Sequence, residues 1–170
     1  MKTENLMNNV RLEKVTLNVG CGPDKEKIER AEKLLELLTK RKPVVTVSKT
    51  RSTFGVPKGN PLGAMITLRK QPAAEFLKRA FYALENKLKE SQIDKSGNFS
   101  FGIHEYIDIQ GIKYSHDVGL LGLDVAVSLE KPGYRVKKRK VKTDRLGKRK
   151  AITKEEVAEW LKNNFGVQLV

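Results

Sequence analysis

Residues 11–20 read RLEKVTLNVG, and apolar side chains alternate with polar ones along most of this stretch. Alternation with a period of two is typical of a β-strand that buries one face and exposes the other. Similar short stretches follow, and we expect them to form further strands: PVVTV at 43–47, AMITLR at 64–69, NFSFGI at 98–103, YIDI at 106–109 and LDVAVSLE at 123–130.

Three segments around these strands have apolar residues at helical spacing. The first begins at Pro23-Asp24 and runs to about Thr39, and the second runs from Pro72 to about Lys89. The second segment's apolar residues are Phe76, Leu77, Ala80, Phe81, Leu84 and Leu88. The third covers about 153–165, where Thr153 and Glu156 have the spacing of a capping box. The pattern predicts one α+β domain over 1–170, with a largely antiparallel sheet, helices packed on one face and the other face open for binding.

The charge of the chain is strongly positive and unevenly placed. Lys and Arg outnumber Asp and Glu by 34 to 20, which gives a net charge of +14. Residues 40–74 contain eight Lys or Arg and no acid, and residues 131–150 contain eleven against one acid. Such an excess indicates a polyanionic partner, either nucleic acid or an acidic membrane surface. Two separate basic segments on an otherwise slightly acidic chain favour a nucleic-acid surface, with 131–150 as a basic extension.

The connection between two of the expected strands is unusual. It reads KTRSTFGVPKGNPLG at 49–63 and holds three cations, three glycines and no acid. A hairpin commonly closes in about two to five residues, so this longer cationic loop is expected to reach an anionic partner. For Phe54, in the middle of the loop, functional contact and local packing both remain open. Phe99 and Phe101 alternate on one expected strand and favour core packing over base stacking.

Motifs for catalysis, metals and membranes are weak. GCG at 20–22 lacks the third glycine of a dinucleotide-binding fingerprint, and two histidines with one cysteine do not support a zinc site. Asp108, Asp117 and Asp124 could hold magnesium in a nuclease, but aspartates beside glycines more often form turns. We therefore expect no enzyme, no cofactor and no metal. The single cysteine and the lack of a long apolar run predict a soluble intracellular protein with no membrane partner.

Several blocks in order resemble a known family: RLEKVTLNVG, FGVPKGNPLGAMITLR, GNFSFGIHEYIDIQGIKY, GLDVAVSLEKPGYRVKKRK and TKEEVAEWLKNNFGV. Over nearly all 170 residues the chain is similar to the universal L-five family of large-subunit ribosomal proteins, the 5S-rRNA-binding proteins, in their archaeal and eukaryotic form. The resemblance implies a structural protein of the cytoplasmic ribosome. Its implied partners are 5S rRNA, 23S-type rRNA, P-site tRNA, a small-subunit head protein across an intersubunit bridge and other central-protuberance proteins.

The resemblance also implies which residues bind. The 5S rRNA contacts fall on Asn18, Lys42, Thr46, Lys49, Thr67 and Arg69. The loop that reaches P-site tRNA contains Arg51, Ser52, Thr53, Phe54 and Lys58. From the dense cations of the extension, we expect large-subunit rRNA contacts at Arg135, Lys137, Lys138, Arg139 and Lys140. The alternatives are a free RNA-binding factor, which acts in assembly or tRNA handling, and a magnesium nuclease.

Overall fold

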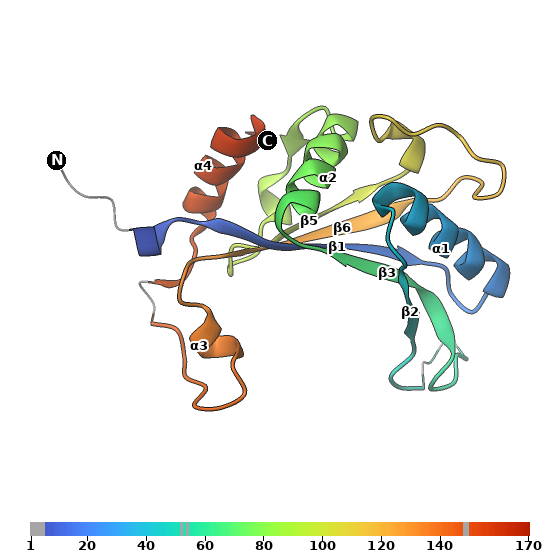
Figure 1. Ribbon diagram of the computed structural model, residues 1–170, viewed down its shortest axis with the longest axis horizontal. Helices are drawn as coiled ribbons and strands as arrows, with labels where there is room; N and C mark the ends of the chain where they lie inside the picture. The colour runs from blue at the N-terminus through green and yellow to red at the C-terminus, as the bar shows by residue number, and fades with distance from the viewer. Residues whose placement is uncertain (1–5, 52, 54, 148–149) are drawn as a thin grey trace.

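The computed structural model describes residues 6–51, 53, 55–147 and 150–170. Its main feature is a five-stranded antiparallel sheet with the strand order β2-β3-β1-β6-β5 (Figure 1). The strands are β1 (Arg11–Gly20), β2 (Val44–Val47), β3 (Pro61–Leu68), β5 (Phe99–Ile103) and β6 (Leu123–Glu130). The predicted α+β class is confirmed, and the first expected strand, β1, pairs on both of its edges.

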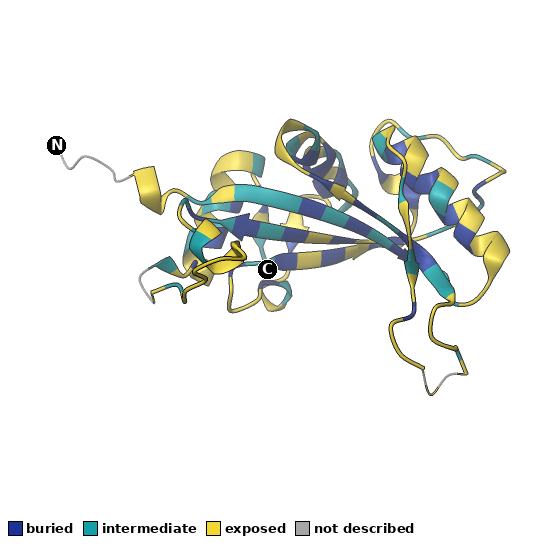
Figure 2. Cartoon of the chain, turned by 60° about the horizontal axis from the view of Figure 1, so that its bottom comes forward, coloured by how far each residue is buried: buried dark blue, intermediate teal, exposed yellow. Residues whose placement is uncertain are grey.

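The longer helices all lie on one side of this sheet (Figure 1). They are α1 (Lys25–Thr39), α2 (Lys70–Ala83) and α4 (Lys154–Phe165). Val15, Leu17 and Val19 of β1 are at most 2% exposed, and they pack with the apolar faces of the helices in one core. Figure 2 shows buried residues alternating with more exposed ones along the strands. The opposite side of the sheet is therefore open, as predicted.

Short elements complete the fold. They are the single 3-10 turns η1 (Leu6–Asn8), η2 (Glu90–Gln92) and η3 (Tyr106–Asp108), the short helix α3 (Arg135–Lys138), and the two-residue strands β4 (Lys87–Leu88) and β7 (Gln168–Leu169). β4 and β7 pair in parallel, which joins the end of the chain to the segment after α2. Within the described ranges, no helix is both long and apolar enough to cross a bilayer.

Local sequence signals explain both ends of α4 and the start of α1. The Asp24 carboxylate accepts hydrogen bonds from the backbone N–H groups of Glu26 and Lys27, so it caps α1. In α4, Thr153 and Glu156 form the predicted capping box. Gly166 ends this helix in the left-handed region at φ 67°, as expected for a C-cap glycine.

Two predictions of secondary structure were wrong. α2 ends at Ala83 rather than near Lys89, because Glu85 and Asn86 adopt left-handed φ values of 52° and 56° and turn the chain. Leu88 still enters the core, but it does so from β4. YIDI forms the turn η3 instead of a strand. Tyr106 is fully buried there, and its hydroxyl accepts a hydrogen bond from the Ser115 N–H at 2.9 Å.

The pairing of β3 with β1 depends on a glycine. Gly63 lies opposite Gly20, and a Cβ at position 63 would collide with the backbone carbonyl oxygen of Val19, whereas a Cβ at position 20 would meet no heavy atom within 4 Å. We predict that Gly63→Ala lowers the free energy of unfolding by about 1–3 kcal/mol, the cost of overpacking. Gly20→Ala, its register partner, should change it by less than about 0.5 kcal/mol. Urea unfolding of both variants tests this, and equal losses would contradict the close approach at Gly63.

Candidate nucleic-acid interface

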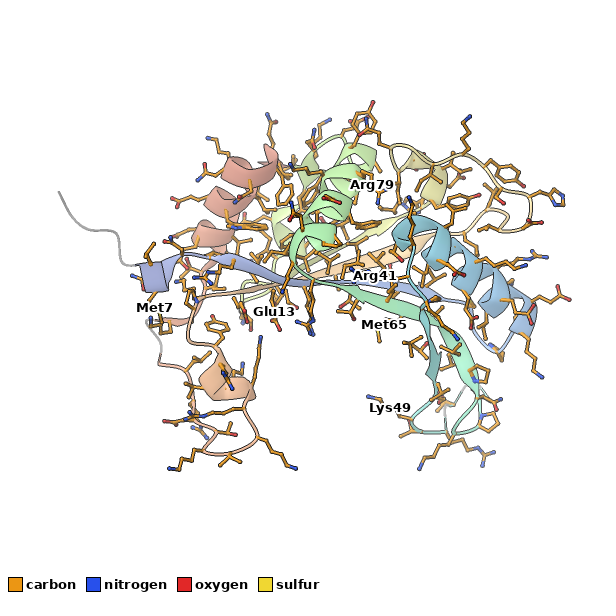
Figure 3. All side chains as sticks on the ribbon, viewed as in Figure 1. Met7, Glu13, Arg41, Lys49, Met65 and Arg79 are labelled. Carbon is orange, nitrogen blue, oxygen red and sulfur yellow. The ribbon has the colours of Figure 1, made fainter. Side chains whose placement is uncertain are left out.

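The open face of the sheet presents mostly short, neutral side chains. Asn18 of β1 lies between Met65 of β3 and Asp124 of β6. The next row along the sheet has Thr16 between Thr67 and Ala126. Figure 3 shows the Met65 and Glu13 side chains on the side away from the helices. This face therefore offers hydrogen-bonding groups to a partner without a dense positive charge of its own.

The predicted 5S rRNA contacts are brought together on one part of this face. Asn18, Thr46 and Thr67 lie on the three adjacent strands β1, β2 and β3, and Thr46 pairs with Gly63 of β3. Lys42 is exposed in the connection before β2, and Lys49 is exposed just beyond its end. The arrangement places neutral groups at the centre and cations at the border.

A cationic hairpin projects from one end of the open face. The β2–β3 connection extends on the side of the sheet away from the helices (Figure 1). Backbone hydrogen bonds from Ser48 N–H to the Asn60 carbonyl (2.8 Å) and from Gly59 N–H to the Ser48 carbonyl (2.9 Å) continue the two-stranded pairing beyond the strands. Gly59 has φ 90°, which only glycine adopts readily. The described part of the loop thus extends the hairpin beyond the strands.

Most of the described residues between 49 and 60 are exposed, and Val56 is half-buried. Arg51, Thr53 and Lys58 are solvent-exposed. Ser52 and Phe54 were predicted to belong to the same loop surface, and both lie outside the described residues. The two alternatives for Phe54 therefore remain open.

The basic extension projects from the other end of the same face and is anchored at its base (Figure 1). Lys131 is only 3% exposed, and its Nζ lies 2.7 Å from the Glu156 carboxylate and 3.3 Å from the Ala151 carbonyl oxygen. The Tyr134 hydroxyl donates to the Lys150 carbonyl at 3.0 Å, and partial burial raises the pKa of this phenol. The first and last parts of 131–150 are thus tied to the body of the protein, with α3 between them.

Lys138, one of the predicted large-subunit rRNA contacts, has two carboxylate partners in the protein. The Lys138 Nζ lies 2.6 Å from Glu13 Oε1 and 2.8 Å from Glu130 Oε2, and Arg69 Nη1 lies 3.8 Å from the same Glu13 oxygen. Partial burial would lower the pKa of Lys138, but the hydrogen bonds to the two carboxylates outweigh it and raise the pKa. These contacts fasten α3 to the start of β1 and the end of β6. Arg135, Lys137, Arg139 and Lys140 are exposed.

Sequence reasoning did not find Glu13 and Glu130 as partners of the binding-site cations. Their proximity depends on the antiparallel pairing of β1 with β6, in which Arg11 lies opposite Glu130. The register between β1 and β6 would have predicted this proximity, because antiparallel pairing places the start of β1 beside the end of β6.

A metal centre is not formed by the described residues, where no three His, Cys, Asp or Glu side chains gather in a group that could hold an ion.

The fold and the placement of charge are those of a basic α+β domain of the nucleic-acid-binding class. The family described as Ribosomal protein L5 matches residues 5–56, and the family that describes the C-terminus of these ribosomal proteins matches residues 61–160.

Archaeal relatives match over nearly the whole chain. Large ribosomal subunit protein uL5 of Methanosphaera stadtmanae is 45% identical over 97% of this chain and 99% of its own length. The proteins of the same name from Sulfolobus acidocaldarius and Nanoarchaeum equitans are 45% and 43% identical, over 99% and 98% of this chain and 96% and 99% of their own lengths. The chain belongs to the L5 family of large-subunit ribosomal proteins, as the sequence resemblance predicted. It is a structural component of the cytoplasmic ribosome and not an enzyme.

The contacts of Lys138 predict a difference between neighbouring lysines. Lys137→Gln should reduce the slope of log affinity against log salt for rRNA by about 0.7–0.9, the value for one lost phosphate contact. Lys138→Gln should leave this slope nearly unchanged, because its ammonium group is neutralised by Glu13 and Glu130, but it should speed amide hydrogen exchange in 131–147. Binding titrations between low and high salt, with exchange measured on the free proteins, test both. If Lys138→Gln reduces the slope of log affinity against log salt by about one, this lysine contacts a phosphate and the prediction is wrong.

Proposed function

We propose that this protein binds 5S rRNA on the open face of its sheet and attaches it to the central protuberance of the large ribosomal subunit. The observation that carries this proposal is the neutral polar face, which is flanked by two cationic projections on the side opposite the helices. Membership of the L5 family supports it, and so do relatives that are named as large-subunit proteins.

The chemistry of the face suits an irregular RNA. Cations attract any RNA through its phosphates, and this attraction is sensitive to salt and independent of sequence. Selectivity must come from groups that read sugar and base edges, and from shape. Asn18, Thr46 and Thr67 are short neutral hydrogen-bonding residues on adjacent strands, while Lys42, Lys49 and Arg69 border them. We assign the first group to selectivity and the second to phosphate contact.

The remaining partners are assigned to the two cationic projections and to surfaces outside the open face. The exposed cations of the extension, Arg135, Lys137, Arg139 and Lys140, are suited to 23S-type rRNA. Within the ribosome the protein would also contact other central-protuberance proteins and a small-subunit head protein across the intersubunit bridge. The hairpin, with Arg51, Thr53 and Lys58 exposed, is assigned to P-site tRNA.

The first prediction from this proposal concerns selectivity. The purified protein should bind 5S rRNA at least about tenfold more tightly than tRNA or random RNA of equal length at about 0.15 M salt. Thr16→Ala with Thr67→Ala, which removes two neutral groups from one row of the face, should narrow the preference without changing the salt slope. Competition binding measures both quantities. Equal competition by random RNA would reject 5S rRNA as the partner.

The second prediction separates the hairpin from the 5S site. Deletion of residues 52–58 should leave 5S rRNA binding within a few-fold, but it should speed dissociation of P-site tRNA from reconstituted ribosomes. The effect should be on the order of 1 kcal/mol, because a few exposed charge contacts add little to a tRNA held mainly by rRNA. Replacing Arg51 and Lys58 by glutamine keeps the loop backbone and should give part of the same effect. Loss of 5S binding with unchanged tRNA dissociation would assign the hairpin to the 5S site.

A further inference from the structure

The open face carries three carboxylates, and they differ in their surroundings. Glu13 and Glu130 lie at one end of the face, where Lys138 contacts both and Arg69 approaches Glu13. Asp124 lies on β6 nearer the other end, and the described residues provide no hydrogen bond or ion pair to its side chain. On a face that attracts a polyanion, an unneutralised carboxylate repels phosphate and therefore weakens unselective binding.

A hollow of about 390 Å³ lies beside Asp124. Its lining consists of Asn18, Gly20, Gly102, Ile103, His104, Gly122, Leu123 and Asp124. Asn18 and Asp124 are directly opposite each other in the pairing of β1 with β6. Their side chains therefore lie on the same side of the sheet, with Cβ atoms about 5 Å apart. The Asp124 carboxylate leans toward β5, because a Cβ built on Gly102 would lie 3.5 Å from its Oδ1. The hollow is thus lined by a carboxylate, an amide, the backbone of three glycines and His104.

This pair of side chains has a defined hydrogen-bonding pattern. An ionised aspartate only accepts, with two oxygens side by side, and the asparagine amide can donate. Unpaired bases in RNA are read on their Watson–Crick edges by groups of this kind. Guanine presents two adjacent donors, N1–H and the N2 amino group, beside the O6 acceptor. Adenine and the pyrimidines lack the two adjacent donors that would satisfy both carboxylate oxygens.

We propose that this hollow is a binding site for an unpaired guanine base, in which Asp124 accepts from N1–H and N2–H and Asn18 donates to O6. The site deepens the proposed RNA-binding function and rests on it. Asp124 then contributes to selectivity in two ways. It binds the guanine base, and it repels the phosphates of RNA that presents no unpaired guanine.

The decisive variant is Asp124→Asn, because the two explanations of this residue predict opposite signs. If Asp124 reads guanine, the variant should bind 5S rRNA about tenfold more weakly, the loss expected for one bidentate base contact, while it binds random RNA as tightly or more tightly. If Asp124 is only a surface charge, its removal should strengthen binding to both RNAs. Asp117→Asn, an exposed aspartate in the connection before β6, removes the same charge as a matched control and should leave the ratio of the two affinities unchanged.

A second variant tests the hollow without changing charge. Gly102→Val fits a β-strand and places its side chain beside Asp124, so it should fill part of the hollow, retain the fold and reduce the preference for 5S rRNA. Inosine lacks the N2 amino group. When it is placed singly at the guanosines of 5S rRNA, one position should weaken binding to the wild-type protein but not to Asp124→Asn.

The outcomes separate this inference from the proposed function. If the wild-type protein fails to prefer 5S rRNA, the proposed function is rejected. If the wild-type preference is present but Asp124→Asn binds 5S rRNA equally or more tightly, the function stands and the guanine site is rejected. A Gly102→Val protein that keeps the full preference, or the absence of any inosine effect, would also overturn the site.

Discussion

The two-residue period of β1, held between β3 and β6, is the constraint on which the rest of the structure depends. Val15, Leu17 and Val19 enter the core, while Thr16 and Asn18 face the opposite way. A slip of one residue would exchange these two sets, so the burial of the core also fixes the groups that the open face presents. The open face is therefore specified by the same strand pairing that stabilises the fold, and this pairing alone positions its side chains.

The charges of the molecule are arranged around this neutral surface. The cations are concentrated on two projections at opposite ends of the face, and at one end the carboxylates Glu13 and Glu130 pair with Lys138. Under the proposed function, affinity from the projections is general for RNA and falls with salt, whereas the sheet between them supplies hydrogen bonds with fixed geometry. A net charge of +14 is thus compatible with selectivity, because attraction and discrimination are assigned to different parts of the surface.

Local signals in the sequence were enough to predict most of the fold. The alternation in β1, the helix start at Asp24 and the capping box at Thr153 act within a few residues of their own positions, and the structure confirms each of them. The end of α2 was not predictable in this way, because the apolar spacing of Leu84 and Leu88 resembles a helix, although Leu88 reaches the core from a strand. The sequence also predicted that one face of the sheet is not covered by helices. The pairing of Lys138 with Glu13 and Glu130 was not predictable, because it depends on strand register and tertiary packing, which local patterns do not contain.

Both projections are joined to the sheet by hydrogen bonds or ion pairs between described residues at their bases. The hairpin continues the β2–β3 pairing through backbone hydrogen bonds at Ser48 and Gly59. The extension is held at its base by Lys131, which is buried against Glu156, and at α3 by Lys138. A backbone that is already fixed at its base loses less conformational entropy on binding than a flexible tail. Under the proposed function, an RNA would have to fit the distance between the two projections as well as the groups on the sheet, so the shape of the protein would contribute to selectivity beyond its individual contacts.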